Sequence, residues 1–188
     1  DEMEIRLLKD LGDSLDKMER IVSKTKATGQ LMASVLEPRD LIKTVRNSVE
    51  RFLISKGDLE VEMSLDTAEA SVLADPLLDS LVTNIIENAY EHNPKDDKRI
   101  WIELISVDRG FELRIADNGP GIPHDVRTGL VDPSRRQGGV GLHMSRHIVE
   151  KYGGTLTIED RVAKRPQGGT LVRIWLPVTS PGAPEEAS

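Results

Sequence analysis

The stretch GGVGLHMSRHIVEKYGG, residues 138–154, places glycine clusters on both sides of a helical pattern. Glycine is unfavourable in and beside a helix unless the backbone requires it, because it loses more conformational freedom on folding than any other residue. Gly138, Gly139 and Gly141 precede a helix expected at 142–152, so successive backbone N–H groups and the helix N-terminus can point at one anion. We therefore expect a phosphate site here.

Two other glycine motifs do not fit this stretch. The Walker pattern G-x-x-x-x-G-K-[ST] is absent from the chain, and the dinucleotide pattern G-x-G-x-x-G, begun at Gly139, requires glycine where Met144 stands. At the far end, Gly153 and Gly154 are expected only to end the helix and turn the chain into the next strand.

A second candidate lies on the segment LVTNIIENAYEH, within a helix expected at 75–92 with Asp75 as its N-cap. Asn84 and Asn88 are four residues apart and share one face, and His92 lies one turn further along. Amide oxygens in such a row can bind a hard cation such as magnesium. The alternative is a row of ordinary asparagines on a solvated face.

The third candidate is ADNGPGIP, residues 116–123, at the end of a strand expected at 111–117. Asp-Asn-Gly-Pro-Gly is first of all a turn, because its glycines permit positive φ. A carboxylate at this position, Asp117, can instead accept a hydrogen bond from an exocyclic amine such as that of adenine, while the glycines let the ring approach the backbone.

Hydrophobic patterns outside these segments predict an alternation of helices and strands. The proline in EPRD, residues 37–40, predicts a boundary before a helix at 40–57 that Asp40 caps. A long loop at 119–139 is expected to be functional or mobile. The other expected strands are 59–65, 70–75, 100–107, 155–160 and 170–177, and the polar tail 179–188 is expected to be disordered.

The N-terminal 36 residues contain no proline and carry a narrow apolar seam with spacings of three and four. Such a seam favours packing against a partner helix, as in a coiled coil, over packing on the helix's own domain.

Composition narrows the classes of function. Of 188 residues, 38% are hydrophobic and 30% charged, as in a soluble globular protein, and the net charge of −7 argues against a nucleic-acid partner. The absence of cysteine excludes disulfides and thiolate chemistry and is compatible with the cytoplasm. Neither a transmembrane run nor a signal peptide is visible, so no membrane contact by this fragment is expected.

The asparagine helix, the Asp-x-Gly-x-Gly loop, the glycine loop before a helix and a late QGGT (residues 167–170) occur in this order. Together they resemble the N, G1, G2 and G3 boxes of the GHKL ATPase superfamily, and residues 40–177 resemble the catalytic domain of sensor histidine kinases, with a closing segment more similar to archaeal than to bacterial members. The resemblance implies an α/β (α+β) two-layer sandwich of the Bergerat type, with a mixed β-sheet packed against about three helices. It also implies three parts: the second helix of a dimerisation hairpin at 1–36, an ATP-binding domain at 37–178 and the tail.

The resemblance assigns roles by position. Asn88 would coordinate magnesium with Asn84 on the same face, Asp117 would accept from the adenine amino group, and Gly119 and Gly121 would give room for the ring. Glu91 stands where many bacterial kinases carry a basic residue, so His92, Arg135 or Arg136 would contact phosphate instead. The remaining nucleotide-binding positions are Ile122, Gly138, Gly139, Val140, Gly141 and Leu142, with Gly169 and Thr170 at the adenine end and a mobile ATP lid between Gly121 and Gly138.

The implied activity is binding of Mg-ATP and transfer of the γ-phosphoryl group to a histidine, for relay to an aspartate on a response-regulator receiver domain. Hydrolysing relatives such as gyrases and Hsp90 chaperones have a glutamate where this chain has Asn84, which cannot accept a proton at neutral pH. The alternatives are a GHKL ATPase or protein-serine kinase, and a non-catalytic interaction module, which the missing phenylalanine-rich F box and Glu91 favour.

The phosphoacceptor is expected outside this chain. Of its four histidines only His124 is followed by an acidic residue, and it lies in the expected lid. His143 and His147 are expected to be ordinary helix-surface residues rather than metal ligands. We expect a fragment of a longer, cytoplasmic or membrane-anchored sensor that forms a homodimer through its dimerisation helices.

Overall fold

The computed structural model describes residues 34–56, 59–123, 127, 140–163, 165 and 167–179. The chain divides into two compact units, Asp1–Ser34 and Val35–Ser188, and the fold described below is that of the second. The predicted dimerisation helix 1–36 lies outside the described residues except for 34–36, which are not helical. That helix and the disordered tail stay predictions.

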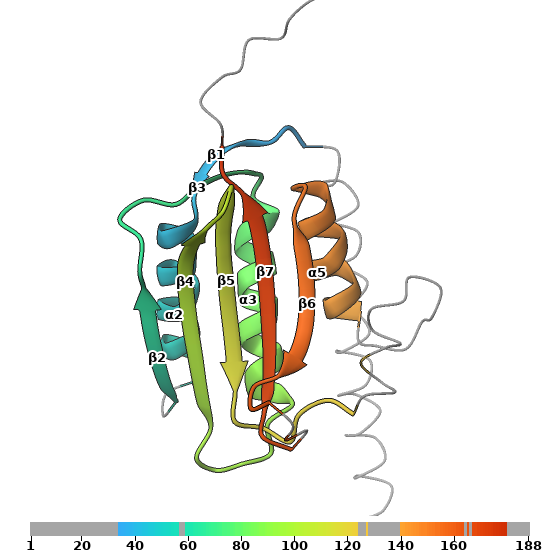
Figure 1. Cartoon of the computed structure of the whole chain (residues 1–188). Helices are drawn as coiled ribbons and strands as arrows, with labels where there is room; N and C mark the ends of the chain where they lie inside the picture. Colours follow the sequence, from blue (N-terminus) through green and yellow to red (C-terminus); the bar gives the residue numbers. More distant parts are fainter. Residues whose placement is uncertain are drawn as a thin grey trace, which may run out of the picture. The chain divides into compact units, whose positions relative to one another are not determined.

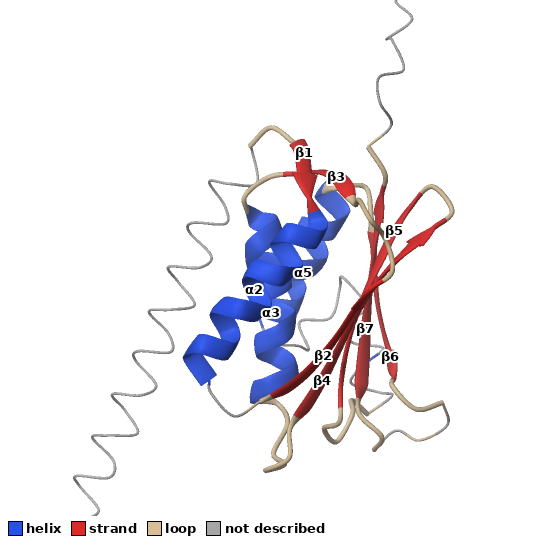
Figure 2. Cartoon of the chain, turned by 90° about the vertical axis from the view of Figure 1, so that its left-hand side faces the viewer, coloured by secondary structure: helices blue, strands red, loops and turns tan. Residues whose placement is uncertain are grey.

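Over its described residues, the second unit is a two-layer sandwich in which three helices cover one face of a five-stranded mixed sheet (Figures 1 and 2). Strand β2 pairs in parallel with β4, and the other neighbours are antiparallel. The strands, in sheet order, are β2 (Glu60–Leu65), β4 (Arg99–Val107), β5 (Gly110–Asp117), β7 (Thr170–Pro177) and β6 (Thr155–Asp160), and the helices are α2 (Leu41–Lys56), α3 (Leu77–Glu91) and α5 (Val140–Lys151). The predicted fold class is confirmed.

Alternation along the strands decides which face the helices cover. In β4, Ile100, Ile102 and Leu104 are buried toward the helices, whereas Trp101 and Glu103 are only half-buried on the other face. Asp117 shares the helix-covered face, because the register places it opposite Ile100. The last side chain of β5 is therefore held inside the sandwich.

Helix α3 is the central helix of the covering layer, between α2 and α5 (Figure 1), and it also packs against β4 and β5. It buries an unusually wide apolar surface made of Leu77, Leu78, Leu81, Val82, Ile85, Ile86 and Ala89. A helix apolar over so much of its circumference is typical of an interior position. Consequently every polar side chain on α3 that is not at its rim requires a partner.

Two local predictions need correction. Residues Glu37–Asp40 form a short strand, β1, which pairs antiparallel with β3 (Ser71–Ala74) rather than acting only as a boundary. A two-stranded sheet has open edges, so a proline, which has no N–H to donate, is tolerated there. The N-cap of α3 is Pro76 and not Asp75, although the Asp75 carboxylate still accepts the Leu77 N–H at 2.8 Å.

The other expected elements lie close to their predicted positions. Asp40 caps α2 by accepting the Lys43 N–H at 3.0 Å. Helix α5 begins at Val140, two residues before the prediction, and β6 and β7 have the predicted bounds. None of the helices described is both long and apolar enough to cross a bilayer.

A buried polar cluster ties the end of α5 to the start of α3. The Asp75 side chain is fully buried and accepts hydrogen bonds from the Lys151 ammonium and the Tyr152 hydroxyl. Burial, followed by the contact with Asp75, raises the pKa of Tyr152 well above its usual range, so the hydroxyl keeps its proton. The Lys151 ammonium is only 14% exposed and forms an ion pair with this carboxylate.

We predict that Asp75→Asn lowers the free energy of unfolding by about 3–5 kcal/mol, because the change removes one partner of a buried ion pair. Urea denaturation of the chain followed by circular dichroism measures the loss. Glu60→Gln is the matched control, since its ion pair with Arg99 is about half exposed on both sides and is worth less than about 1 kcal/mol. Equal losses in the two variants would contradict the prediction.

Candidate functional site

The predicted site segments meet at one end of the sandwich. The C-terminal end of α3, the end of β5 and the start of β7 lie at the lower end of Figure 1, and the start of α5 is the end of that helix nearer to them. This edge brings Asn88, Asp117 and Thr170 to the same end of the domain. Four of the predicted positions lie outside the described residues: Arg135, Arg136, Gly138 and Gly139. The side chain of Val140 is not described either.

Asp117 is a buried carboxylate, only 8% exposed. Its Oδ1 accepts the Gly119 N–H at 2.7 Å and the Thr170 N–H at 3.2 Å, so the two backbone donors fix the orientation of the carboxylate. Burial raises the pKa of Asp117 above its usual value, while these hydrogen bonds and the charge of Arg161 partly oppose the shift. The protein thus retains a carboxylate at an energetic cost, which is typical of functional sites.

Glycine is required at positions around Asp117 because a side chain there would collide with other atoms of the protein. A Cβ on Gly169 would lie 1.9 Å from the Asp117 carbonyl oxygen, and Gly169 has φ +100°. A Cβ on Gly119 would lie 2.9 Å from Asp117 Oδ1. Gly121 also has positive φ, 75°, and Ile122 beside it is half-buried. These glycines let the loops close on the carboxylate; room for an adenine ring stays a prediction.

Asn84 belongs to the seam between α3 and α5. Its Nδ2 donates to Ser145 Oγ at 2.8 Å, and that hydroxyl donates to the Gly141 carbonyl at 2.9 Å. A Cβ on Gly141 would lie 2.5 Å from Asn84 Oδ1, so glycine at this position lets the start of α5 approach α3. Sequence reasoning assigned Gly141 to phosphate and missed Ser145, whose only indication was a polar residue one turn after a helix-opening glycine.

Asn88 differs from Asn84 although the two are one turn apart. Its side chain is half-buried and forms no hydrogen bond with another residue in the described part of the chain, while its backbone carbonyl accepts the His92 N–H at 3.2 Å. His92 is exposed and ends the helix. The Asn88 amide oxygen is therefore available to a ligand.

The donor set fits magnesium, which takes one or two protein oxygens and completes its shell with water and substrate phosphates. Asn88 supplies a neutral oxygen of the required kind. No group of three or more histidine, cysteine or acidic side chains able to hold a metal occurs among the residues that the structure describes. A cation here would therefore depend on the phosphates of a bound ligand.

Two buried asparagines complete this end of the domain, and sequence reasoning missed both. Asn118 Oδ1 accepts from Asn93 Nδ2 at 2.7 Å and from the Arg99 N–H at 3.0 Å, while its Nδ2 donates to the Asp97 carbonyl at 2.8 Å. In the sequence, Asn118 lies in the Asp-Asn-Gly-Pro-Gly stretch that was interpreted as a turn, and Asn93, which precedes a proline, was given no role.

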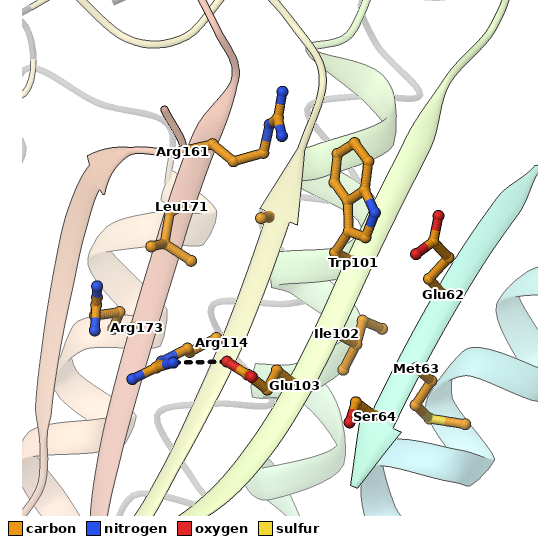
Figure 3. Close-up of a pocket in the computed structure, with 11 residues that line it drawn as sticks. Glu62, Met63, Ser64, Trp101, Ile102, Glu103, Arg114, Arg161, Leu171 and Arg173 are labelled. Carbon is orange, nitrogen blue, oxygen red and sulfur yellow. Dashed lines mark hydrogen bonds and ion pairs between the residues drawn. The ribbon is translucent and has the colours of Figure 1, made fainter. Parts of the chain in front are cut away.

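A hollow of about 470 Å³ lies on the opposite, open face of the sheet (Figure 3). Its side chains largely satisfy one another: Arg114 pairs with Glu103 at 2.7 Å, and the Arg161 guanidinium lies 4.5 Å from the Trp101 ring centre. Because Asp117 faces the helices, this hollow is separate from the candidate nucleotide site.

Comparisons with known proteins agree with this geometry. The family model described as histidine kinase-, DNA gyrase B-, and HSP90-like ATPase matches residues 74–180. Sensor protein KdpD of Mycobacterium tuberculosis (strain CDC 1551 / Oshkosh) is 29% identical over 197 residues, which covers 96% of this chain. The chain spans only 22% of the length of that relative.

Solved structures give the same result. The mycobacterial sensor histidine kinase MprB is 32% identical, with a TM-score of 0.65, and the match covers 77% of this chain and 98% of that one. Histidine kinase ThkA, solved in complex with response regulator protein TrrA, shares the fold with a TM-score of 0.70 at 20% identity, over 89% of this chain and 49% of that one. The predicted archaeal affinity stays a prediction. The chain belongs to the family of histidine kinase-, DNA gyrase B-, and HSP90-like ATPases, and its second unit is an ATP-binding domain of the sensor histidine kinase type.

Proposed function

We propose that this domain binds Mg-ATP and transfers the γ-phosphoryl group to a histidine of the sensor kinase to which it belongs, for relay to a response-regulator aspartate. Two side chains at the same end of the sandwich carry the proposal. Asp117 is a buried carboxylate that two backbone N–H groups orient, and the Asn88 side chain has no hydrogen-bond partner among the described residues.

Asp117 recognises the adenine end. An ionised carboxylate only accepts hydrogen bonds, so it selects a base that presents an amino group. Burial strengthens that selection, because a base without the amino group would leave the carboxylate desolvated and without a partner. Thr170 and Gly119 keep the acceptor in place through their backbone N–H groups.

Asn88 and the start of α5 bind the phosphate end. The Asn88 oxygen would hold magnesium, which supplies neutralisation of the negative charge on the phosphates. The first N–H groups of α5, from Val140 to Leu142, have no intrahelical acceptor and are suited to phosphate oxygens. His92, one turn beyond Asn88, is exposed for a further phosphate contact. The roles of Arg135, Arg136, Gly138 and Gly139 belong to the same proposal.

The seam at Asn84 favours transfer over hydrolysis. Its amide cannot take up a proton from water, and it is already bound to Ser145. Catalysis then depends on positioning the phosphoryl group and neutralising its charge, while the acceptor is a histidine outside this chain. A GHKL ATPase would require a base at this position, so that alternative is less well supported.

The partners follow from the same proposal. The complex of ThkA with TrrA supports a response-regulator receiver domain as a partner of this chain as well. We propose that the parent protein is a homodimer joined by dimerisation helices, of which 1–36 provides one, and that this domain lies in the cytoplasmic part of a membrane-anchored sensor.

We predict that Asp117→Ala weakens binding of a non-hydrolysable Mg-ATP analogue by about 10- to 100-fold, the usual effect of losing a hydrogen bond to a charged group. Isothermal titration calorimetry measures the affinity. Asp108→Ala is the matched control, because Asp108 is an exposed residue in the turn between β4 and β5, whereas Asp117 lies at the far end of β5. No detectable binding by the unmodified chain would overturn the kinase proposal in favour of a non-catalytic module.

Asn88→Ala is predicted to remove most of the affinity that magnesium adds while leaving metal-free binding within about threefold, because only the cation contact is lost. Titrations with magnesium and with a chelator separate the two contributions. Asn47→Ala, at an exposed asparagine of α2, is the control. A variant that responds to magnesium like the unmodified chain would remove Asn88 from the site.

Incubation of the full-length parent with labelled ATP tests the reaction. The expected product is acid-labile, alkali-stable phosphohistidine on the protein. Acid-stable phosphoserine or free phosphate without labelled protein would instead support one of the alternative activities.

The raised pKa of Asp117 predicts a specific pH dependence. A carboxyl group whose pKa is higher in the folded than in the unfolded protein stabilises the fold at a pH below its pKa in the unfolded chain. This contribution is lost as the pH rises through its pKa in the folded protein. Without nucleotide, Asp117→Asn should therefore gain stability relative to the unmodified chain as the pH rises from 4 to 7, while its nucleotide affinity falls. Urea midpoints of both proteins across this range measure the difference, and a relative loss of stability with rising pH would contradict the prediction.

A further inference from the structure

We propose that Asn93 and Asn118 are positioning residues that fix the separation between the adenine half and the magnesium half of the site. This inference rests on the proposed function, because it assigns a task to residues that hold Asp117 and Asn88 in register. Neither asparagine needs to touch the nucleotide.

The Asn118 side chain, at the end of β5, contacts the segment 93–99 between α3 and the start of β4 at three points. Its Oδ1 accepts from Asn93 Nδ2 at 2.7 Å and from the Arg99 N–H at 3.0 Å, and its Nδ2 donates to the Asp97 carbonyl at 2.8 Å. A backbone bond from the Asn118 N–H to the Arg99 carbonyl, 3.3 Å long, lies beside them. The residue that follows Asp117 is thereby fixed to the start of β4 and to the segment after α3.

Asn93 anchors the other side of this connection. It is 1% exposed, and its Oδ1 accepts the Lys95 N–H at 3.2 Å while its Nδ2 is used by Asn118. The Lys98 ammonium donates to the carbonyl of Asn93 and to that of Tyr90, and it lies 4.8 Å from the centre of the Tyr90 ring. The last turn of α3 is thus bound from several directions to the loop that Asn118 also holds.

The position of this network explains why spacing matters. Asp117 is the chain neighbour of Asn118, and Asn88 lies five residues before Asn93, just over one helical turn away. One amide–amide hydrogen bond, from Asn93 to Asn118, therefore joins the two segments that carry the groups proposed to bind opposite ends of a single ligand. A ligand held at two points gains the full benefit of the second contact only if the protein already presents both at the correct separation.

Two roles make different predictions for binding. If the bond fixes the separation, breaking it should spare adenosine, which uses the Asp117 end alone, and should reduce the additional affinity from magnesium and the triphosphate. If the bond only supports the fold, breaking it should lower stability and affect all ligands alike.

The test measures dissociation constants for adenosine, and for a non-hydrolysable ATP analogue with and without magnesium, in Asn93→Ala and Asn93→Asp. Asn93→Ala removes the donor to Asn118, whereas Asn93→Asp keeps the shape and the acceptor for Lys95 but cannot donate. We expect both variants to bind adenosine with an affinity within about threefold of the unmodified chain. The increase in affinity for the ATP analogue that magnesium produces should be smaller by a factor of about ten or more in both. Asp75→Asn, which weakens the fold at the other end of α3, is the control and should retain the full gain.

Each other outcome is informative. An unmodified chain that binds neither ATP analogue nor adenosine would refute the proposed function itself. If magnesium increases the affinity of the unmodified chain for the ATP analogue, two results for the variants would overturn only the positioning role. In one, the variants keep this increase; in the other, they lose adenosine affinity and the magnesium-dependent increase equally. Failure of both Asn93 variants to fold at low temperature would also overturn it, because the bond would then belong to the stability of the fold.

Discussion

The burial of helix α3 is the constraint on which the rest of the domain depends. A helix enclosed by two others and by a sheet gains apolar burial along most of its length, but each polar group it carries must then find a partner or lose several kcal/mol. Its start is held through Asp75, its middle through Asn84 and the segment after its end through Asn93. Among the asparagines Asn84, Asn88 and Asn93, Asn88 differs because the residues described give its side chain no such partner.

This contrast separates two asparagines that the sequence presents as equivalent. The Asn84 amide donates a hydrogen bond to Ser145 and lies against Gly141, so this residue joins helices α3 and α5. Asn88 lies at the rim, where an amide oxygen can exchange water for a cation. A polar residue in a buried helix therefore identifies a ligand site only when its neighbours leave it without a hydrogen bond.

Much of the fold was predictable because it follows from local patterns. The alternation in 155–160 and 170–177 predicts β6 and β7 with the observed bounds, and the cap at Asp40 follows from residue type alone. Asp117 could also be found, since an acidic residue at a strand end before glycines is visible in one short segment. Its burial and the second of its backbone donors, the N–H of the distant Thr170, became evident only in the folded domain.

The network of Asn93 and Asn118 and the hydroxyl of Ser145 were not predictable for a related reason. Each makes its decisive contact with a residue 25 or more positions away, or through a helix pair whose crossing no periodicity describes. Turn-forming residues such as Asn118 have a sufficient local explanation, which conceals a long-range one. The pairing of β1 with β3 was missed in the same way, because a proline was interpreted as a break.

The open face of the sheet has a consequence for how the domain meets its surroundings. A chain of ion pairs crosses β4, β5, β7 and β6 through Glu103, Arg114, Glu112, Arg173 and Glu159. Covering this face with a second apolar layer would strip water from all of these charges at once, at a cost that their mutual attraction does not fully repay. Hydration therefore protects a sheet that has helices on one side only, and it disfavours face-to-face stacking of domains in a crowded cell.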